Sequence, residues 1–414
     1  MLSGTKSNIK RVRMRTSSYR LGCITNSFCH KCSISTYRPF PVRYHKTVSS
    51  PRSFSISLPN HQLPRPSEVM NTIKNTLGEN LGGKAQSLST HQFSLDDVPD
   101  LSGKVAVVTG GSEGIGYGCT YTLLQHGIAQ VYVLSLSADV ARGARDALAA
   151  ALGPDAAART RWIQCDLADW PRVKAAADEI KRGAERLDIL INNAGRGAMA
   201  FELTDYGVDR HMAVNHMGHV VLTSHLLPLL RRTASRHATT ARIALQASNA
   251  HAAAPGDVRF ASAAELSRDL GPSAQYGRSK LAAILWARYF ARHSDSGNGG
   301  VLMNATHPGF VSTRMSREDI YDAYPRAGHA VAVGLEPLKK TAFQGAAPIM
   351  YAATCATGSG LYICPPAVPE EGSALACDGA LGDRLMELTR RVVREKTRRE
   401  SADRGCPFDD LVLY

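Results

Sequence analysis

A glycine-rich segment at residues 109–116, Thr-Gly-Gly-Ser-Glu-Gly-Ile-Gly, constrains the fold of this chain more than any other stretch. It follows an apolar run at residues 105–108 and precedes a helix-like stretch at residues 117–126. Glycines at such a junction allow a tight turn and let a phosphate approach the N–H groups that begin the helix. The segment therefore predicts a nucleotide diphosphate site, although a strand-to-helix turn without a ligand would have the same pattern.

Short apolar runs recur along the chain after this segment, separated by longer helical stretches rich in Ala and Leu. Continuous apolar strands between helices are typical of a parallel sheet that helices cover on both faces. No run reaches the roughly 18 apolar residues of a membrane helix, so we expect no membrane-spanning segment. The pattern predicts a single doubly wound α/β domain over residues 96–400, with strands at residues 104–109, 130–135, 161–165, 187–192, 242–248 and 300–306.

The net charge of +13 is concentrated in the first part of the chain. Residues 1–69 contain twelve lysines and arginines but one acid, Glu68, so they contribute +11 and leave +2 for residues 70–414. The later part of the chain therefore gives no basis for a nucleic-acid-binding surface.

Residues 1–95 are expected to form a disordered basic extension rich in Ser and Arg. The composition of residues 1–69 is typical of a mitochondrial transit peptide. A region upstream of a true start at Met70, or a disordered tail, would have a similar composition. We therefore expect a mitochondrial location if residues 1–69 are a transit peptide and a cytoplasmic one if the protein starts at Met70. Residues 401–414 are expected to be a C-terminal tail.

The nine cysteines do not form a recognisable framework. Cys29 and Cys32 are the only pair at metal-ligand spacing, and no second pair follows them, so no metal site is expected. Five cysteines are expected to be reduced, mostly buried thiols: Cys119, Cys165, Cys355, Cys364 and Cys377.

Polar residues occur where the predicted strands end. Asp166 and Leu167 close the third strand, where the acid could accept a hydrogen bond from an adenine amino group or cap the next helix. Asn192-Asn193-Ala194-Gly195 closes the fourth strand, and its amides either stabilise the sheet or line a cofactor cleft. Asn215 lies in a predicted helix among apolar residues, where a buried amide often has only a structural role.

Ser248 closes the fifth predicted strand, and Tyr276 and Lys280 follow it in a helical pattern. The i, i+4 spacing places the phenol and the ammonium group on one face of that helix. The pKa of a free Tyr is near 10, and a neighbouring positive charge favours the phenolate, which brings proton transfer toward neutral pH. A Tyr-x-x-x-Lys pair by itself is more often a solvated helix face, but its place after a strand that ends in Ser indicates a catalytic site.

The order of these features resembles the short-chain dehydrogenase/reductase family. The resemblance covers about residues 98–400 and includes Pro308-Gly309-Phe310-Val311-Ser312-Thr313. Residues 214–219 and 276–282 are similar to its retinol-dehydrogenase-like branch, which includes many fungal oxidoreductases. The resemblance implies a Rossmann fold with a seven-stranded parallel sheet in the order 3-2-1-4-5-6-7, a nicotinamide dinucleotide cofactor, and interconversion of an alcohol and a carbonyl.

The resemblance also implies a role for each residue of the catalytic set. Ser248 would hydrogen-bond the substrate oxygen, and Tyr276 would give or take the proton. Lys280 would lower the pKa of Tyr276 and bind the nicotinamide ribose, while Asn215 would hold a water that connects Lys280 to solvent. The dinucleotide is expected to contact Gly110, Ser112, Glu113, Gly114, Ile115, Gly116, Asp166, Leu167, Asn193, Ala194, Gly195, Tyr276, Lys280, Pro308, Gly309, Val311 and Thr313.

The choice between NAD and NADP is left open by the sequence. An acid at the end of the second strand binds the ribose 2′-hydroxyl of NAD, whereas an Arg there pairs with the 2′-phosphate of NADP. Residues 135–137, Ser-Leu-Ser, offer neither, and Glu113 would repel a phosphate, so NAD is slightly favoured. The family itself tends to use NADP. Arg142 or Arg145 could pair with the 2′-phosphate of NADP if the next helix turns one of them toward the cofactor.

Two segments depart from the compact members of the family. Ser248 and Tyr276 are 28 positions apart because residues 251–275 form an insert, which we expect beside the substrate entrance. Residues 314–340 are expected to form the opposite wall, either as a lid or as a packed surface helix.

Two other functions share part of this sequence pattern. A catalytically silent dinucleotide-binding sensor or scaffold is the alternative, and the complete Asn, Ser, Tyr and Lys set argues against it. Nucleotide-sugar epimerases share the Tyr-x-x-x-Lys pair but differ in glycine spacing. The expected partners are a small-molecule alcohol or carbonyl and a second copy of the chain in a homodimer. Residues 382–399, a predicted basic helix, could also touch a lipid surface.

Overall fold

Strands and helices alternate along the part of the chain that the computed structural model describes, residues 92–294, 300–311 and 340–397. The strands are β1 (Val105–Thr109), β2 (Gln130–Ser135), β3 (Thr160–Gln164), β4 (Ile189–Asn192), β5 (Ala241–Gln246), β6 (Val301–Thr306), β7 (Tyr362–Cys364) and β8 (Val368–Glu370). The longer helices are α2 (Gly114–Gln125), α3 (Ala138–Leu152), α5 (Trp170–Gly183), α7 (His219–His237), α9 (Pro272–His293), α12 (Ala342–Thr354) and α14 (Gly379–Lys396). The short helical segments are η1 (Leu95–Asp97), α4 (Pro154–Ala158), α6 (Arg210–Met212), the π-helix η2 (Ala213–Gly218), η3 (Asn249–Ala253), α8 (Ala263–Leu266) and α13 (Ala374–Cys377).

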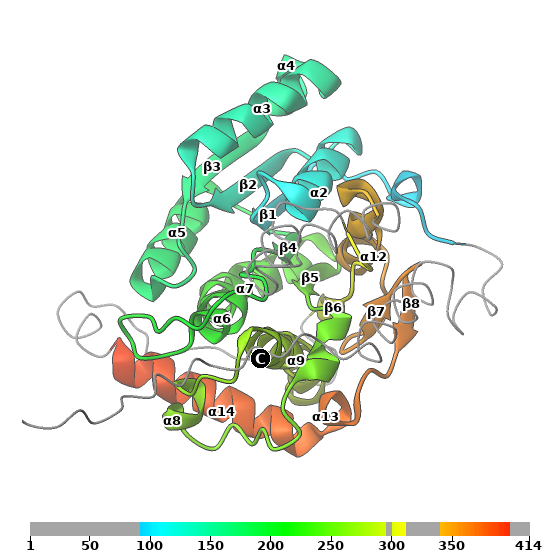
Figure 1. The fold of residues 1–414 in the computed structure, drawn as a ribbon. Coiled ribbons are helices and arrows are strands. Elements are labelled where there is room, and N and C mark those ends of the chain that lie inside the picture. The colour runs from blue at the N-terminus through cyan, green and yellow to red at the C-terminus, as the bar shows by residue number, and fades with distance from the viewer. Residues whose placement is uncertain (1–91, 295–299, 312–339, 398–414) are drawn as a thin grey trace, which may run out of the picture. The chain divides into compact units, whose positions relative to one another are not determined.

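The strands form one sheet in the order β3-β2-β1-β4-β5-β6-β7-β8 (Figure 1). The pairs from β3 to β7 are all parallel, which confirms the predicted fold class and strand order. The eighth strand was not predicted, and it runs antiparallel to β7, with Ile363 opposite Pro369. It escaped the sequence pattern because it has only three residues and contains a proline, which is tolerated at a sheet edge.

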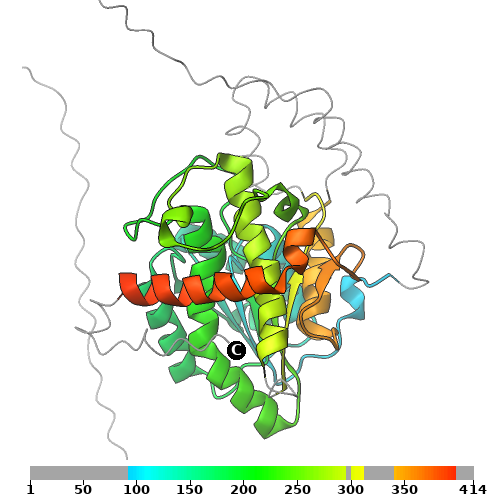
Figure 2. The same ribbon diagram turned by 90° about the horizontal axis from the view of Figure 1, so that it is seen from below.

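Helices cover both faces of the sheet, and the side chains of each strand alternate between the two cores. On β1, Val107 packs into the core formed with α5, α7, α9 and α14, whereas Ala106 and Val108 pack into the core formed with α2, α3 and α12. Helix α14 crosses the outer side of α9 (Figure 2). Phe93 also packs on the fold, since its ring lies 5.3 Å from that of Tyr351 in α12.

The predicted C-terminal helix is present as α14, with Leu385 and Val392 buried and Arg390 and Arg394 exposed. None of the helices among the described residues combines the length and the apolar character that crossing a membrane requires. Residues 1–91, most of the predicted wall at 314–340, and the tail at 401–414 lie outside the described residues.

Parallel pairing brings the carboxyl ends of β1, β4, β5 and β6 to the same edge of the sheet. Ligands of open α/β sheets bind outside this edge. The segments that follow these four strands are the ones that the sequence selected, so the candidate site is built from them.

Candidate active site

The glycine-rich segment forms a closely packed turn between β1 and α2. Gly110 has a φ of +64°, which favours glycine. A Cβ added to Gly116 would lie 2.1 Å from the Gly110 oxygen and 2.5 Å from Asn193 Nδ2, so no side chain fits there. Glu113 is the N-cap of α2, but its side chain makes no capping hydrogen bond. The N–H groups that begin α2 are therefore not capped by that side chain, as expected of a phosphate-binding helix terminus.

Thr109, the last residue of β1, joins this turn to the end of β4. Its hydroxyl oxygen accepts hydrogen bonds from the N–H groups of Asn193 (2.9 Å) and Ala194 (3.0 Å). Asn193 Nδ2 in turn donates to the Thr109 carbonyl at 3.0 Å. Asn192 has a different role, because its amide donates to Thr223 Oγ1 on α7 at 2.9 Å. Of the two amides, Asn193 shapes the cofactor side and Asn192 stabilises the sheet.

His219 connects Thr109 with Asn215 in the interior. Its Nδ1 lies 3.2 Å from the Asn215 carbonyl, and its Nε2 lies 2.9 Å from Thr109 Oγ1. Burial, together with the charge of Lys280, lowers the pKa of His219 to about 4, so the ring is neutral near pH 7. A neutral ring must carry its proton on Nδ1 to donate to the carbonyl, and Nε2 then accepts from the Thr109 hydroxyl. His219 was not among the predicted site residues, although its i+4 spacing from Asn215 was a usable signal.

The Asn215 side chain links the loop after β4 to α9. Its Oδ1 accepts from the Arg196 N–H at 2.7 Å, and its Nδ2 donates to the Arg196 carbonyl at 2.9 Å and to Ser279 Oγ at 2.9 Å. Asn215 lies in the π-helix η2. Such helices are rare in proteins, and those that occur are often found at functional sites. Its side chain therefore positions Arg196 and Ser279, while the predicted role of holding a water stays a prediction.

Tyr276 and Lys280 lie together on α9, as their spacing predicts. Lys280 Nζ is 5.5 Å from the centre of the Tyr276 ring, and Lys280 is buried with 5% of its surface exposed. The ammonium group also donates to the Gln246 carbonyl at the end of β5, at 2.7 Å. A Cβ added to Gly195 would lie 3.5 Å from Lys280 Nζ and 3.2 Å from Asn215 Oδ1. The side chains of Asn215 and Lys280 thus both lie close to Gly195, and Lys280 lies beside the phenol.

Ser248 is the N-cap of η3, two residues after the end of β5, and its hydroxyl accepts from the Ala250 N–H at 3.1 Å. Helix α9 approaches this turn closely at Gly277, where an added Cβ would lie 2.7 Å from the Ala250 oxygen. This approach brings the segment of Tyr276 against the segment of Ser248 across the 28-position gap. Gly277 was not among the predicted site residues, and its place next to Tyr276 was the only signal.

His251 links the backbone of Ser248 to the backbone of Ser373. Its Nδ1 donates to the Ser248 carbonyl at 2.8 Å, and its Nε2 accepts from the Ser373 N–H at 3.0 Å. Burial lowers the pKa of His251, which agrees with a neutral ring that donates at one nitrogen and accepts at the other.

Asp166 lies at the end of β3, where the adenine contact was predicted. One of its carboxylate oxygens accepts from the Ala168 N–H at 2.8 Å, and the other pairs with Arg210 at 3.1 Å. The alternative prediction, a helix cap, is wrong, because Asp169 caps α5 by accepting from the Arg172 N–H. Asp166 instead closes a short turn, and 37% of its side chain remains exposed. Leu167 beside it is buried.

The segment after β6 contributes Pro308, Gly309 and Val311. Val311 pairs with Lys340, and Gly309 has a φ of +80°. A Cβ added to Gly345 of α12 would lie 2.5 Å from Val311 and 3.4 Å from Ile115, so the two predicted cofactor segments adjoin one helix. Thr313 lies outside the described residues.

The residue after β2 has an exposed apolar side chain, at the position where an acid would select NAD or an arginine would select NADP. Leu136 is 61% exposed. Arg142 forms a surface ion pair with Asp139 at 3.2 Å. Arg145 is the arginine that the helix turns toward the glycine-rich segment, because it lines a cavity of about 60 Å³ together with Ser112.

These residues fit a dinucleotide, since the turn is too close-packed for a side chain at Gly111 and Gly116 and lies at a helix start beside the strand ends. The family model for short chain dehydrogenases matches residues 104–322. The proposed mitochondrial oxidoreductase bli-4 of Neurospora crassa is 51% identical over 377 residues, which is 90% of this chain and 91% of the relative. An uncharacterized oxidoreductase of Schizosaccharomyces pombe is 33% identical over 302 residues, 70% of this chain and 80% of the relative.

The fold has a counterpart among solved structures. The crystal structure of an uncharacterized protein from Mycobacterium paratuberculosis matches with a TM-score of 0.56 at 24% identity, over 73% of this chain and 97% of that one. The likeness at this identity supports the fold alone. The family model and the relatives carry the assignment further: the chain belongs to the short chain dehydrogenase family, and it is an oxidoreductase that uses NAD or NADP.

Proposed function

We propose that this protein interconverts an alcohol and a carbonyl, with Tyr276 as the general acid and base. The observation that carries the proposal is the buried ammonium group of Lys280, 5.5 Å from the Tyr276 ring. A cation beside a phenol favours the phenolate, which makes proton exchange feasible near neutral pH. Tyr276 itself is half-buried, so part of its side chain or backbone remains exposed.

The neighbouring residues complete the chemistry. When bound, the nicotinamide supplies or accepts the hydride. Ser248 would donate to the substrate oxygen, on which negative charge grows in the reduction. Lys280 would bind the nicotinamide ribose and hold the charge beside Tyr276. Asn215 would hold a water that returns protons to Lys280.

The dinucleotide would lie along the carboxyl edge of the sheet. The turn from Gly110 to Gly116 would hold the pyrophosphate, with Ser112 and Ile115 beside it. Asp166 would accept from the adenine amino group through the exposed part of its carboxylate, and residues 193–195 and 308–311 would line the nicotinamide half.

The test replaces Tyr276 by Phe, which removes the hydroxyl alone. Turnover, measured by NADH and NADPH oxidation over steroids, retinoids, quinones and small aldehydes, should fall about 10²–10⁴-fold. Binding of NAD(P)H, measured by its fluorescence, should stay nearly unchanged. Tyr289→Phe on the same helix is the matched control and should keep full turnover. Turnover retained by Tyr276→Phe would contradict the proposal.

A catalytically silent sensor or scaffold is the second candidate. It would bind NAD(P)H tightly but turn over no compound of the panel. The presence of Asn215, Ser248, Tyr276 and Lys280 in one sequence, with Lys280 beside the Tyr276 ring, supports the enzyme.

We also propose a mitochondrial location. The Neurospora crassa relative carries that location in its name. Residues 1–69 contribute +11 of the net charge, which suits a transit peptide. Sequencing the N-terminus of the protein from purified mitochondria tests this, and a cytosolic protein that begins at Met70 would contradict it.

A further inference from the structure

We propose that Arg278 is a positioning residue that holds both substrate-side loops, residues 196–203 and 254–270, against helix α9. The inference rests on the proposed function, because it concerns the geometry around Tyr276. Both loops follow strands that end at the carboxyl edge of the sheet, where a substrate must enter.

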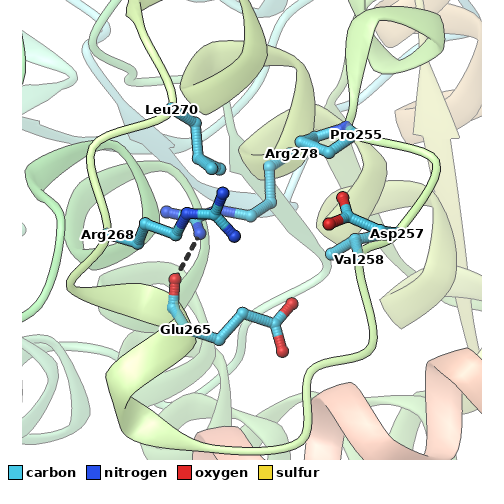
Figure 3. A pocket seen from close by; sticks show the side chains of 7 residues that line it. All are labelled: Pro255, Asp257, Val258, Glu265, Arg268, Leu270 and Arg278. Carbon is cyan, nitrogen blue, oxygen red and sulfur yellow. Dashed lines mark hydrogen bonds between the residues drawn. The ribbon is translucent and has the colours of Figure 1, made fainter.

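Arg278 is fully buried on α9, between Tyr276 and Lys280 in the sequence. Its Nη2 lies 3.1 Å from Asp209 Oδ2, and both side chains have no exposed surface. Its Nη1 donates to the Glu265 carbonyl at 2.7 Å, a bond drawn in Figure 3. A single side chain of the Tyr276 helix is thus bonded to two other segments of the chain.

The Glu265 bond also reaches the turn before α8. The carboxylate of Glu265 accepts from the N–H groups of Arg259, Phe260 and Ala261, at 3.0, 3.1 and 3.0 Å. These bonds hold the turn before α8 in one shape. When Arg278 binds the carbonyl of Glu265, it therefore fixes that turn as well as α8.

Asp209 extends the same connection to the loop after β4. Its Oδ1 lies 3.0 Å from His211 Nδ1, and His211 Nε2 lies 2.8 Å from the Gly197 carbonyl. Its own N–H donates to the Leu266 carbonyl of α8 at 2.9 Å. Burial raises the pKa of Asp209, but the hydrogen bond and charge of His211 and the charge of Arg278 outweigh burial, so the pKa is lowered. Asp209 is therefore an ionised partner for Arg278.

The insert packs into the core through Val258, Phe260 and Leu266, but its packing is incomplete beside Arg278. A cavity of about 30 Å³ lies between Arg278 and the insert, lined also by Arg268, Asp257 and Val258 (Figure 3). A buried ion pair gains little net stability, because lost hydration offsets the attraction, yet it requires one geometry. The polar bonds of Arg278 thus set the position of the loops, and with it the width of the substrate entrance.

The experiment compares Arg278→Lys and Arg278→Met with Arg268→Met, an exposed arginine on the same cavity. Steady-state kinetics give kcat and KM for the best substrate of the panel, and NAD(P)H fluorescence gives the cofactor Kd. We expect both Arg278 variants to raise KM by about tenfold or more, with the cofactor Kd and kcat changed less than about threefold. Arg268→Met should match the wild type in all three.

Amide hydrogen exchange on the full chain without substrate provides a readout that needs no turnover. Exchange in residues 196–203 and 254–270 should be faster in Arg278→Lys than in the wild type and in Arg268→Met. If Arg278→Met does not fold, Arg278→Lys, which keeps the charge near Asp209, carries the test. Unchanged KM and unchanged exchange in Arg278→Lys would overturn the inference, as would a cofactor Kd that rises as much as KM. A wild type without any turnover would instead refute the proposed function, and the exchange data would still decide the role of Arg278.

Discussion

The contact between α9 and η3 at Gly277 makes a strong prediction, because one added methyl group must move the segment of Tyr276. The Cβ of Gly277→Ala would lie 2.7 Å from the Ala250 oxygen, 2.8 Å from the Ala254 nitrogen and 2.9 Å from the Ala253 carbonyl carbon. All three are backbone atoms, so no side-chain rotation relieves the overlap. The two segments must separate by about 0.7 Å to reach the 3.4 Å at which ordinary contacts begin.

The expected loss follows from this displacement. A misplacement of about 1 Å in a catalytic site can reduce the rate about 100-fold, so kcat should fall by roughly 10- to 100-fold. Overpacking costs about 1–3 kcal/mol, and alanine gains about 1 kcal/mol over glycine within a helix. The net loss of unfolding free energy should therefore stay below about 2 kcal/mol. The variant should remain folded but be slow.

The assays are kcat with the best panel substrate, NAD(P)H binding by fluorescence, and urea unfolding. Gly143→Ala on α3 is the matched control, because no atom lies within 4 Å of its added Cβ. It should keep the wild-type kcat and gain about 0.5–1 kcal/mol of stability. A wild-type kcat in Gly277→Ala would refute the reasoning, and so would a loss of cofactor binding as large as the loss of kcat.

Three further predictions follow from the described contacts. Burial lowers the pKa of His219 and His225 to about 4 and of His216 to about 3. The unfolded chain takes up these protons at about pH 6.5, before the folded protein does. The free energy of unfolding should therefore fall as the pH drops from about 6.5 to about 4, by about 3 kcal/mol for His219 alone. A urea midpoint that stays constant over this pH range would contradict the prediction. Leu136→Arg should lower the Kd for NADPH but not for NADH, since the guanidinium pairs with a 2′-phosphate, and equal changes for both nucleotides would refute this placement of the ribose. Asp166→Ala should raise the Kd for both nucleotides by about 3- to 10-fold, as expected for one lost hydrogen bond, and an unchanged Kd would exclude the adenine contact.

Sequence patterns located several strands closely because a parallel strand that is buried on both faces is apolar along most of its length, as β1 is. The observed ends of β1, β2 and β6 differ from the predicted ones by at most one residue. The three residues of β8 carry no such pattern, since an edge strand that contains Pro369 needs only a neighbour with free backbone groups.

In the candidate site, too, some features were predictable from the sequence and others were not. Tyr276 and Lys280 were predictable as neighbours because four residues make about one helical turn. The function of each amide was not predictable, since Asn192 and Asn193 are adjacent in the sequence, yet Asn192 bonds to α7 and Asn193 bonds to the end of β1. The sequence analysis named only Asp166 as a candidate cap, whereas the path of the chain into α5 makes Asp169 the cap.

By itself, then, the sequence determined what depends on short-range periodicity and composition: the doubly wound fold, the glycine turn at residues 109–116, and the Tyr276–Lys280 pair. The tertiary structure decided what depends on residues far apart in the chain. It placed His219 between Thr109 and Asn215, brought Gly277 against η3, and buried Arg278 with Asp209. The physical reason is that a buried hydrogen bond or a close backbone contact requires two exact positions in space, and the identity of either residue alone does not specify where its partner lies.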